Sequence, residues 1–170
     1  NYAYDMSRDS AEQVIEDMHG EDTSQILSEI QETGDLLEDT SDAPVVKLVN
    51  LMLSQAVKAR ASDIHIEHSQ HALKIRYRVD GILYDMLSPP KRIQSALISR
   101  IKIMAKMNIA EKRLPQDGRI EIRIADKSID IRVSTIPVAF GERVVLRLLD
   151  KTNVLLNVAG ALFSAAFGDA

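Results

Sequence analysis

The feature that most limits how this chain can fold is a run of three alternating segments between residues 119 and 149. Every second position there is isoleucine, valine or leucine, namely Ile120, Ile122, Ile124, Ile129, Ile131, Val133, Val144, Leu146 and Leu148. A period of two is typical of β-strands with one buried face. The sequence therefore predicts three strands of one sheet.

The positions between these apolar residues carry arginines, namely Arg123, Arg132, Arg143 and Arg147. Because successive side chains of a strand point to opposite faces, we expect these guanidinium groups on the open face of the sheet. The planar guanidinium fork matches carboxylate and phosphate oxygens. Two interpretations stay open: a solvated face paired with acids such as Glu121 and Asp130, or a surface for an anionic partner.

The preceding residues predict the rest of the fold. Apolar residues at helical spacing indicate helices over residues 44–60 and 91–109. Strand-like alternation covers residues 62–67, 73–79 and 82–87, and Asp80-Gly81 suits a type I′ hairpin turn. Residues 135–141 are expected to form a longer loop. We expect an α+β fold, a mostly antiparallel sheet of about six strands with two packed helices.

Charge divides the chain into an acidic arm, residues 1–43, and a basic remainder. The arm holds 13 acidic residues and one basic residue, for a net charge of −12, whereas residues 44–170 sum to +8. Residues 9–18 and 23–31 of the arm are compatible with short helices, and residues 34–43 with a linker. The division predicts salt-sensitive attraction within or between subunits, or an anionic partner for the basic body.

Other functional classes find little support. The four polar residues His65, Glu67, His68 and His71 lack the spacing of a zinc site, so no metal is expected. No phosphate-binding glycine loop or serine elbow occurs, so nothing predicts catalysis by this chain alone. The basic residues Lys91, Arg92, Lys102 and Lys106 are interpreted as a solvated helix face. With 4% aromatic residues, stacking on single-stranded nucleic acid is disfavoured.

Five motifs nevertheless occur in a distinctive order. They are ASDIHIE (61–67), RYRVDG (76–81), SRIKIMAKMNIAEKRLPQDGR (99–119), IDIRVSTIP (129–137) and GERVVLRLLDK (141–151). In these motifs the chain strongly resembles the secretion ATPases that drive type II secretion and type IV pilus assembly. The last motif leans toward the type II secretion branch, the general secretion pathway protein E-like ATPases.

The resemblance implies three parts. Residues 1–43 would be the end of a first N-terminal domain with its linker, residues 44–151 a second N-terminal, PAS-like domain, and residues 152–170 an apolar tail that does not match. In this family a RecA-like motor domain with Walker A and B boxes binds ATP and Mg²⁺. This sequence contains no such boxes, so it is expected to be inactive alone and to need no cofactor itself.

The resemblance also implies residue roles and partners. Arg132 and Arg147 would reach the nucleotide phosphates when the domain closes over the motor domain of its own or a neighbouring subunit. The candidate subunit-interface residues are Arg113, Asp117, Arg119 and Arg143. The full-length ATPase would be a cytoplasmic homo-hexamer. It would associate peripherally with the bacterial inner membrane through a secretion platform protein that binds the first N-terminal domain.

Three alternatives remain. The first alternative function is a cyclic-nucleotide sensor, because PAS-like pockets can hold small ligands. A nucleic-acid-binding module that uses the basic stripe over residues 91–106 is another, although no nucleic-acid partner is expected. The third is the equivalent domain of a pilus assembly ATPase.

Overall fold

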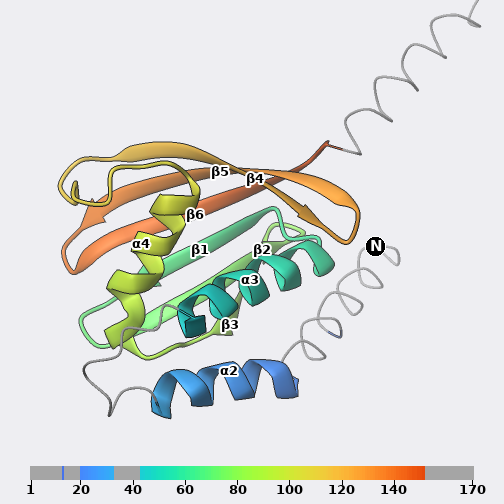
Figure 1. Cartoon of the computed structure of the whole chain (residues 1–170), viewed down its shortest axis with the longest axis horizontal. Coiled ribbons are helices and arrows are strands. Elements are labelled where there is room, and N and C mark those ends of the chain that lie inside the picture. The colour runs from blue at the N-terminus through green and yellow to red at the C-terminus, as the bar shows by residue number, and fades with distance from the viewer. Residues whose placement is uncertain (1–12, 14–19, 33–42, 152–170) are drawn as a thin grey trace, which may run out of the picture.

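The computed structural model describes residue 13, residues 20–32 and residues 43–151 (Figure 1). Within these residues the strands are β1 (Asp63–His68), β2 (Leu73–Val79), β3 (Ile82–Leu87), β4 (Gln116–Ile124), β5 (Lys127–Val138) and β6 (Gly141–Asp150). They form one sheet in the order β3-β2-β1-β6-β5-β4, and every neighbouring pair is antiparallel. The predicted α+β fold is confirmed.

Helices α3 (Ala43–Lys58) and α4 (Gln94–Met104) cover one face of this sheet, and α2 (Glu21–Glu32) packs against α3 (Figure 1). A 3₁₀ turn, η2 (Lys91–Ile93), precedes α4. The helix predicted over residues 91–109 is therefore shorter than expected. It stops because Lys106 adopts a left-handed φ of 57°, and the Lys106 and Met107 amides donate to the Ile103 and Lys102 carbonyls.

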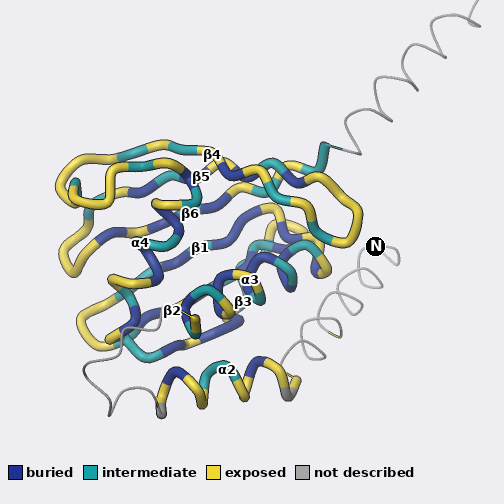
Figure 2. Tube along the Cα trace, viewed as in Figure 1, coloured by how far each residue is buried: buried dark blue, intermediate teal, exposed yellow. Residues whose placement is uncertain are grey.

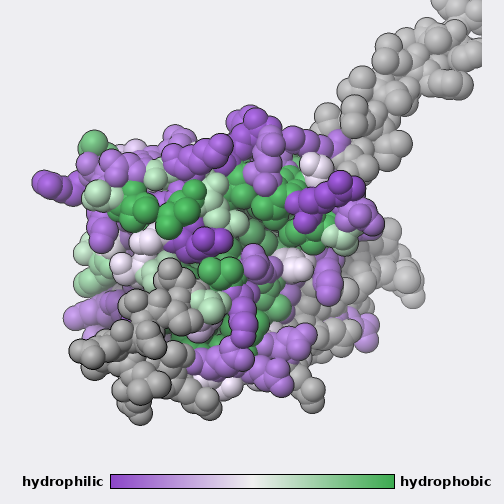
Figure 3. Space-filling view, viewed as in Figure 1, coloured by the Kyte–Doolittle hydropathy of each residue, from purple (hydrophilic) through white to green (hydrophobic). Residues whose placement is uncertain are grey.

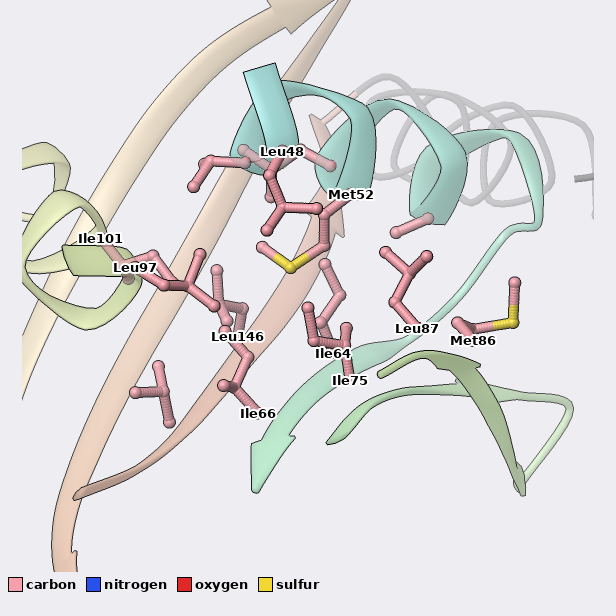
Figure 4. Packing of buried hydrophobic residues seen from close by; sticks show 14 of the residues in the cluster. Leu48, Met52, Ile64, Ile66, Ile75, Met86, Leu87, Leu97, Ile101 and Leu146 are labelled. Atoms are coloured by element: carbon pink, nitrogen blue, oxygen red, sulfur yellow. The ribbon is translucent and has the colours of Figure 1, made fainter. Parts of the chain in front are cut away.

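The core lies between the helices and the covered face of the sheet (Figure 2). Figure 4 shows Leu48 and Met52 of α3 above Ile64 and Ile75, and Leu97 of α4 beside the strands. Burial of each such side chain contributes about 1.5–3 kcal/mol. The alternation that marks the strands in the sequence thus corresponds to one buried face.

One polar group of the core is satisfied by the helix above it. Tyr77 is fully buried, and its hydroxyl donates to the Met52 carbonyl at 2.7 Å. Burial raises the pKa of the Tyr77 hydroxyl above its usual value. The phenol therefore stays neutral and anchors β2 to α3.

The turns follow the predictions in one hairpin and depart from them in two. Asp80 and Gly81 have φ values of 50° and 81°, as a type I′ turn requires. The sequence predicts the β4–β5 turn at Asp126-Lys127, and the structure places it one residue earlier, at Ala125-Asp126. The predicted loop over residues 135–141 is wrong, because the β5–β6 ladder continues to the pair Val138 and Gly141.

One basic side chain assigned to the solvated stripe is buried. Lys102 is 1% exposed, and its Nζ lies 2.7 Å from the Oε1 of Glu142, which is 5% exposed. The Lys102 Nζ also donates to the Glu111 carbonyl at 2.7 Å. The expectation of a solvated Lys102 is wrong because β6 brings an acidic partner to the covered face.

Helix α2, the described part of the acidic arm, is attached to the body by polar contacts near its C-terminus. The Arg92 side chain donates to the Ile30 carbonyl and, at 3.0 Å, to the Gln31 carbonyl, which places a cation at the C-terminus of α2. Lys47 and Glu29 form an exposed ion pair at 3.0 Å. The predicted helix over residues 9–18 and the linker fall outside the described residues, apart from residues 13 and 43.

The face of the described part seen in Figure 3 carries hydrophilic side chains around groups of apolar ones. The large exposed apolar side chains of the described residues are Ile103, Ile109, Leu114, Ile136, Val138, Phe140 and Leu149. None of the helices described here is long and apolar enough to cross a membrane.

Candidate functional site

The open face of the sheet carries a cross-strand row of charged residues, which we call the arginine row. Its members are Arg119 of β4, Arg132 of β5, Arg147 of β6, Asp63 of β1 and Arg78 of β2. Each is the register partner of the next across neighbouring strands. The antiparallel ladder therefore brings together residues that are far apart in the sequence.

Alternation along the strands aims Arg132 and Arg147 at the open face. Ile131 and Val133 flank Arg132 and are buried, and Leu146 beside Arg147 is buried as well. Because neighbours along a strand face opposite ways, both guanidinium groups project away from the helices. The structure thus places the two arginines on one face of adjacent strands, as the alternation predicted.

Asp63 is the acidic member of the row, and both of its carboxylate oxygens have partners. Oδ1 accepts a hydrogen bond from the Arg147 Nε at 3.1 Å, and Oδ2 accepts one from the Ser62 hydroxyl at 2.8 Å. The Arg78 Nε lies 3.7 Å from Oδ2. Burial raises the pKa of Asp63, but these hydrogen bonds and the charge of Arg147 outweigh it, so the net pKa is lowered.

Arg119, at the other end of the row, is also held by acids. Its Nε donates to the Asp130 Oδ1 at 2.6 Å, and its Nη2 lies 2.8 Å from the Glu121 Oε1. The hydrogen bond from Arg119 lowers the pKa of Asp130. Asp130 is therefore ionised near neutral pH, and Arg119 already has two acidic partners.

Arg132, between these two arginines, is the exception. It is exposed and forms no ion pair with any of the residues that the structure describes. The open face is hollowed here into a depression of about 820 Å³, lined by Asp117, Gly118, Arg119, Asp130, Arg132, Val133, Ser134, Val145 and Arg147. The unpaired guanidinium of Arg132, next to the exposed end of Arg147, can bind an anion such as a phosphate.

Three of the four candidate interface residues share this face. Asp117 accepts a hydrogen bond from the Ser134 hydroxyl at 2.7 Å, and Arg119 belongs to the row. Arg143 lies 3.8 Å from the Glu67 carboxylate. Arg113 is instead exposed on the loop between α4 and β4, so the structure does not bring it to the row.

The histidines near β1 do not assemble a metal site. The described residues contain no group of three or more histidine, aspartate or glutamate side chains that could hold a metal ion. The His65 Nδ1 is 3.9 Å from the Glu67 carboxylate. Burial lowers the pKa of His65 and of His68, which favours their neutral forms.

Sequence reasoning missed the acidic end of the row. Asp63 and Arg78 lie in the motifs ASDIHIE and RYRVDG, yet the resemblance implies no role for either. Strand alternation places each on the open face, whereas their position beside Arg147 depends on the pairing of β1 with β6. That pairing is long-range, and no local signal in the sequence specifies it.

Comparison with known proteins gives a consistent result. The family described as "Type II/IV secretion system protein" matches residues 38–169. This range includes most of residues 152–170, which the sequence analysis set apart as a tail and which lie outside the described residues.

Several curated relatives are about half identical to the chain. The type II secretion system protein E of Aeromonas hydrophila is 52% identical over 154 residues, covering 89% of this chain and 31% of that protein. The type II secretion system ATPase E of Vibrio cholerae is 50% identical over 155 residues, with the same two coverages. The Pseudomonas aeruginosa protein E is 48% identical over 159 residues, 93% of this chain and 31% of that protein. The chain thus spans about a third of the length of these relatives.

Proposed function

The chain belongs to the type II/IV secretion system protein family, and on that premise we propose that it is an N-terminal regulatory and subunit-contact domain of an ATPase that powers protein export. About 50% identity to type II secretion system E proteins supports the type II system over pilus assembly. In this proposal the domain supplies Arg132 and Arg147 to the phosphates of a nucleotide bound on a motor domain.

The observation that carries the proposal is the state of Arg132. Arginines on a sheet surface usually pair with nearby acids, as Arg119 does with Asp130 at 2.6 Å. Arg132 has no such partner among the described residues, yet it lies between two other arginines. Like charges directly opposite on neighbouring strands destabilise a sheet. An anionic ligand on this face would relieve the repulsion and use the free donors.

The residues present fit the phosphate part of a nucleotide. The row offers guanidinium donors on an exposed, concave face, and charge-assisted hydrogen bonds to phosphate are among the stronger polar contacts in proteins. The sequence has no glycine loop of its own to cradle phosphates. ATP and Mg²⁺, bound on the motor domain, would supply the phosphoryl group and a counter-charge. Arg132 and Arg147 would stabilise the negative charge on the phosphate oxygens.

The remaining partners follow from the same premise. We propose that the domain contacts the motor domain of its own or a neighbouring subunit in a homo-hexamer. The exposed apolar side chains near the open face, including Ile136 and Leu149, support contact with another protein surface. The proposal extends to a peripheral position at the inner membrane, through a platform protein that binds a preceding domain.

ATP hydrolysis by a full-length ATPase that carries this domain tests the proposal. Replacing either Arg132 or Arg147 with alanine should lower the rate at least tenfold, which corresponds to about 1.4 kcal/mol of transition-state stabilisation. Lysine should restore little, because it lacks the planar fork. Arg123→Ala, at the exposed end of β4 and outside the row, is the matched control. If both alanine variants hydrolyse ATP at the parental rate, Arg132 and Arg147 do not form the phosphate-binding site.

A further inference from the structure

Asp63 is the most buried of the open-face carboxylates whose ion pairs the structure describes. The Asp63 side chain is 8% exposed, whereas Asp85, which pairs with Lys74 and Arg76 on the same face, is 60% exposed. Moving a carboxylate out of water is unfavourable unless its oxygens are bonded. The partners of Asp63 are therefore the reason it can occupy this place, and they lead directly to the arginine row.

The bond between Asp63 and Arg147 uses one specific donor of the guanidinium group. The Nε–H of Arg147 donates to Oδ1, while the side chain as a whole remains 67% exposed. A guanidinium group has five N–H donors, of which four are on the two Nη atoms. The Nε contact thus restrains the plane of the group and leaves the Nη edge for a ligand.

The second oxygen of Asp63 is fixed independently of Arg147. The Ser62 hydroxyl donates to Oδ2 at 2.8 Å, and the Arg78 Nε lies 3.7 Å from the same oxygen. The carboxylate is consequently held from the side opposite Arg147. A rigid acceptor of this kind reduces the conformational freedom that Arg147 would lose on binding a phosphate.

We infer that Asp63 is a positioning residue that orients Arg147 toward the phosphate, an inference that rests on the proposed function. Asp63 does not touch the ligand itself and acts through Arg147 alone. Arg132 has no equivalent acceptor among the described residues. The two arginines are therefore not equivalent: Arg147 is held in place, whereas Arg132 is free to follow the ligand.

This difference makes the inference testable by double-mutant cycles on ATP hydrolysis in a full-length ATPase that carries this domain. Asp63→Ala should lower kcat at least threefold in the parent and in the Arg132→Ala background. In the Arg147→Ala background it should have no further effect. Asp63→Asn keeps a neutral acceptor oxygen for the Arg147 Nε, so it should recover most of the rate. Asp85→Ala, which removes an acid from the same face, is the matched control.

The outcomes separate the two claims. If Arg147→Ala is slow and Asp63→Ala hydrolyses ATP at the parental rate, the positioning role is overturned while the proposed function stands. An equal loss in all three backgrounds would indicate a structural role and would also overturn it. Parental activity of Arg147→Ala would remove the phosphate-binding role of Arg147 and, with it, the positioning role of Asp63.

A spectroscopic readout covers the case in which Asp63→Ala lowers the yield of the ATPase. In this 170-residue chain, nuclear magnetic resonance of the Arg147 Nε–H should show slow exchange with solvent. Asp63→Asn should preserve that slow exchange and Asp63→Ala should abolish it. Rapid exchange in the unmodified chain would contradict the inference.

Discussion

Arg132 of β5 lies directly opposite Arg147 of β6 in the antiparallel register, with both side chains on the open face of the sheet. Of the two, only Arg147 forms an ion pair among the described residues, with the Asp63 carboxylate at 3.1 Å. Two guanidinium groups opposite each other contribute nothing favourable to the sheet itself. We propose that an anion binds between them, and several measurable consequences follow from the structure.

Removing Arg132 should not weaken the fold. Arg132→Ala removes an exposed side chain and its repulsion from Arg147 and Arg119. We expect the free energy of unfolding of this chain at low salt to stay constant or to rise by up to about 1 kcal/mol. Urea unfolding measures the change, and added salt should reduce it. A loss of more than about 1 kcal/mol would show that Arg132 has a structural role.

Removing one member of the buried Lys102–Glu142 pair should be strongly destabilising. Lys102→Met leaves the Glu142 carboxylate buried without its cation, which costs about 3–5 kcal/mol. The double variant with Glu142→Leu should recover most of that loss, because it removes both charges together. Chemical unfolding of the two single variants and the double variant gives the coupling energy. Additive losses would mean that the pair is not coupled.

Two glycines should respond to substitution for different reasons. At Gly118 an added Cβ would lie 2.7 Å from the Ala105 carbonyl oxygen, so Gly118→Ala should destabilise the fold by about 1–3 kcal/mol. At Gly81 a Cβ would meet nothing within 4 Å, and only the left-handed φ of 81° is unfavourable. Asparagine tolerates that φ, so it should be accepted at position 81 and rejected at position 118. Thermal unfolding of both asparagine variants tests this contrast.

Stability should fall as the solution is acidified through the range in which histidine titrates. Burial lowers the folded-state pKa of His65 and of His68 below 6.5, so the unfolded chain binds protons more readily. The histidine contribution is therefore complete above about pH 6.5 and is lost as the pH falls toward the folded-state values. The variant with both histidines replaced by glutamine should show a flatter dependence of Tm on pH. His71→Gln, at an exposed position, controls for the loss of a histidine. An unchanged slope in the double variant would contradict this assignment.

Local patterns predicted the parts of the fold that depend on neighbours in the sequence. Alternation placed Arg132 and Arg147 on the open face, and Asp80-Gly81 predicted its hairpin. The errors that concern the charged residues lie where distant segments meet. Lys102 is buried because Glu142 arrives from another element, and Asp63 reaches Arg147 only through the β1–β6 pairing. Helix periodicity cannot distinguish a solvated lysine from one with a buried partner.

The central claim is that Arg132 and Arg147 contact nucleotide phosphate, and nucleotide affinity tests it most directly. The measurement compares a non-hydrolysable ATP analogue with adenosine, bound to a full-length ATPase that carries Arg132→Ala, Arg147→Ala or neither. The account predicts that each substitution weakens binding of the analogue about tenfold or more, since a charge-assisted hydrogen bond contributes about 1.5–3 kcal/mol. Adenosine affinity should not change. Parental affinity for the analogue in both variants would contradict the account.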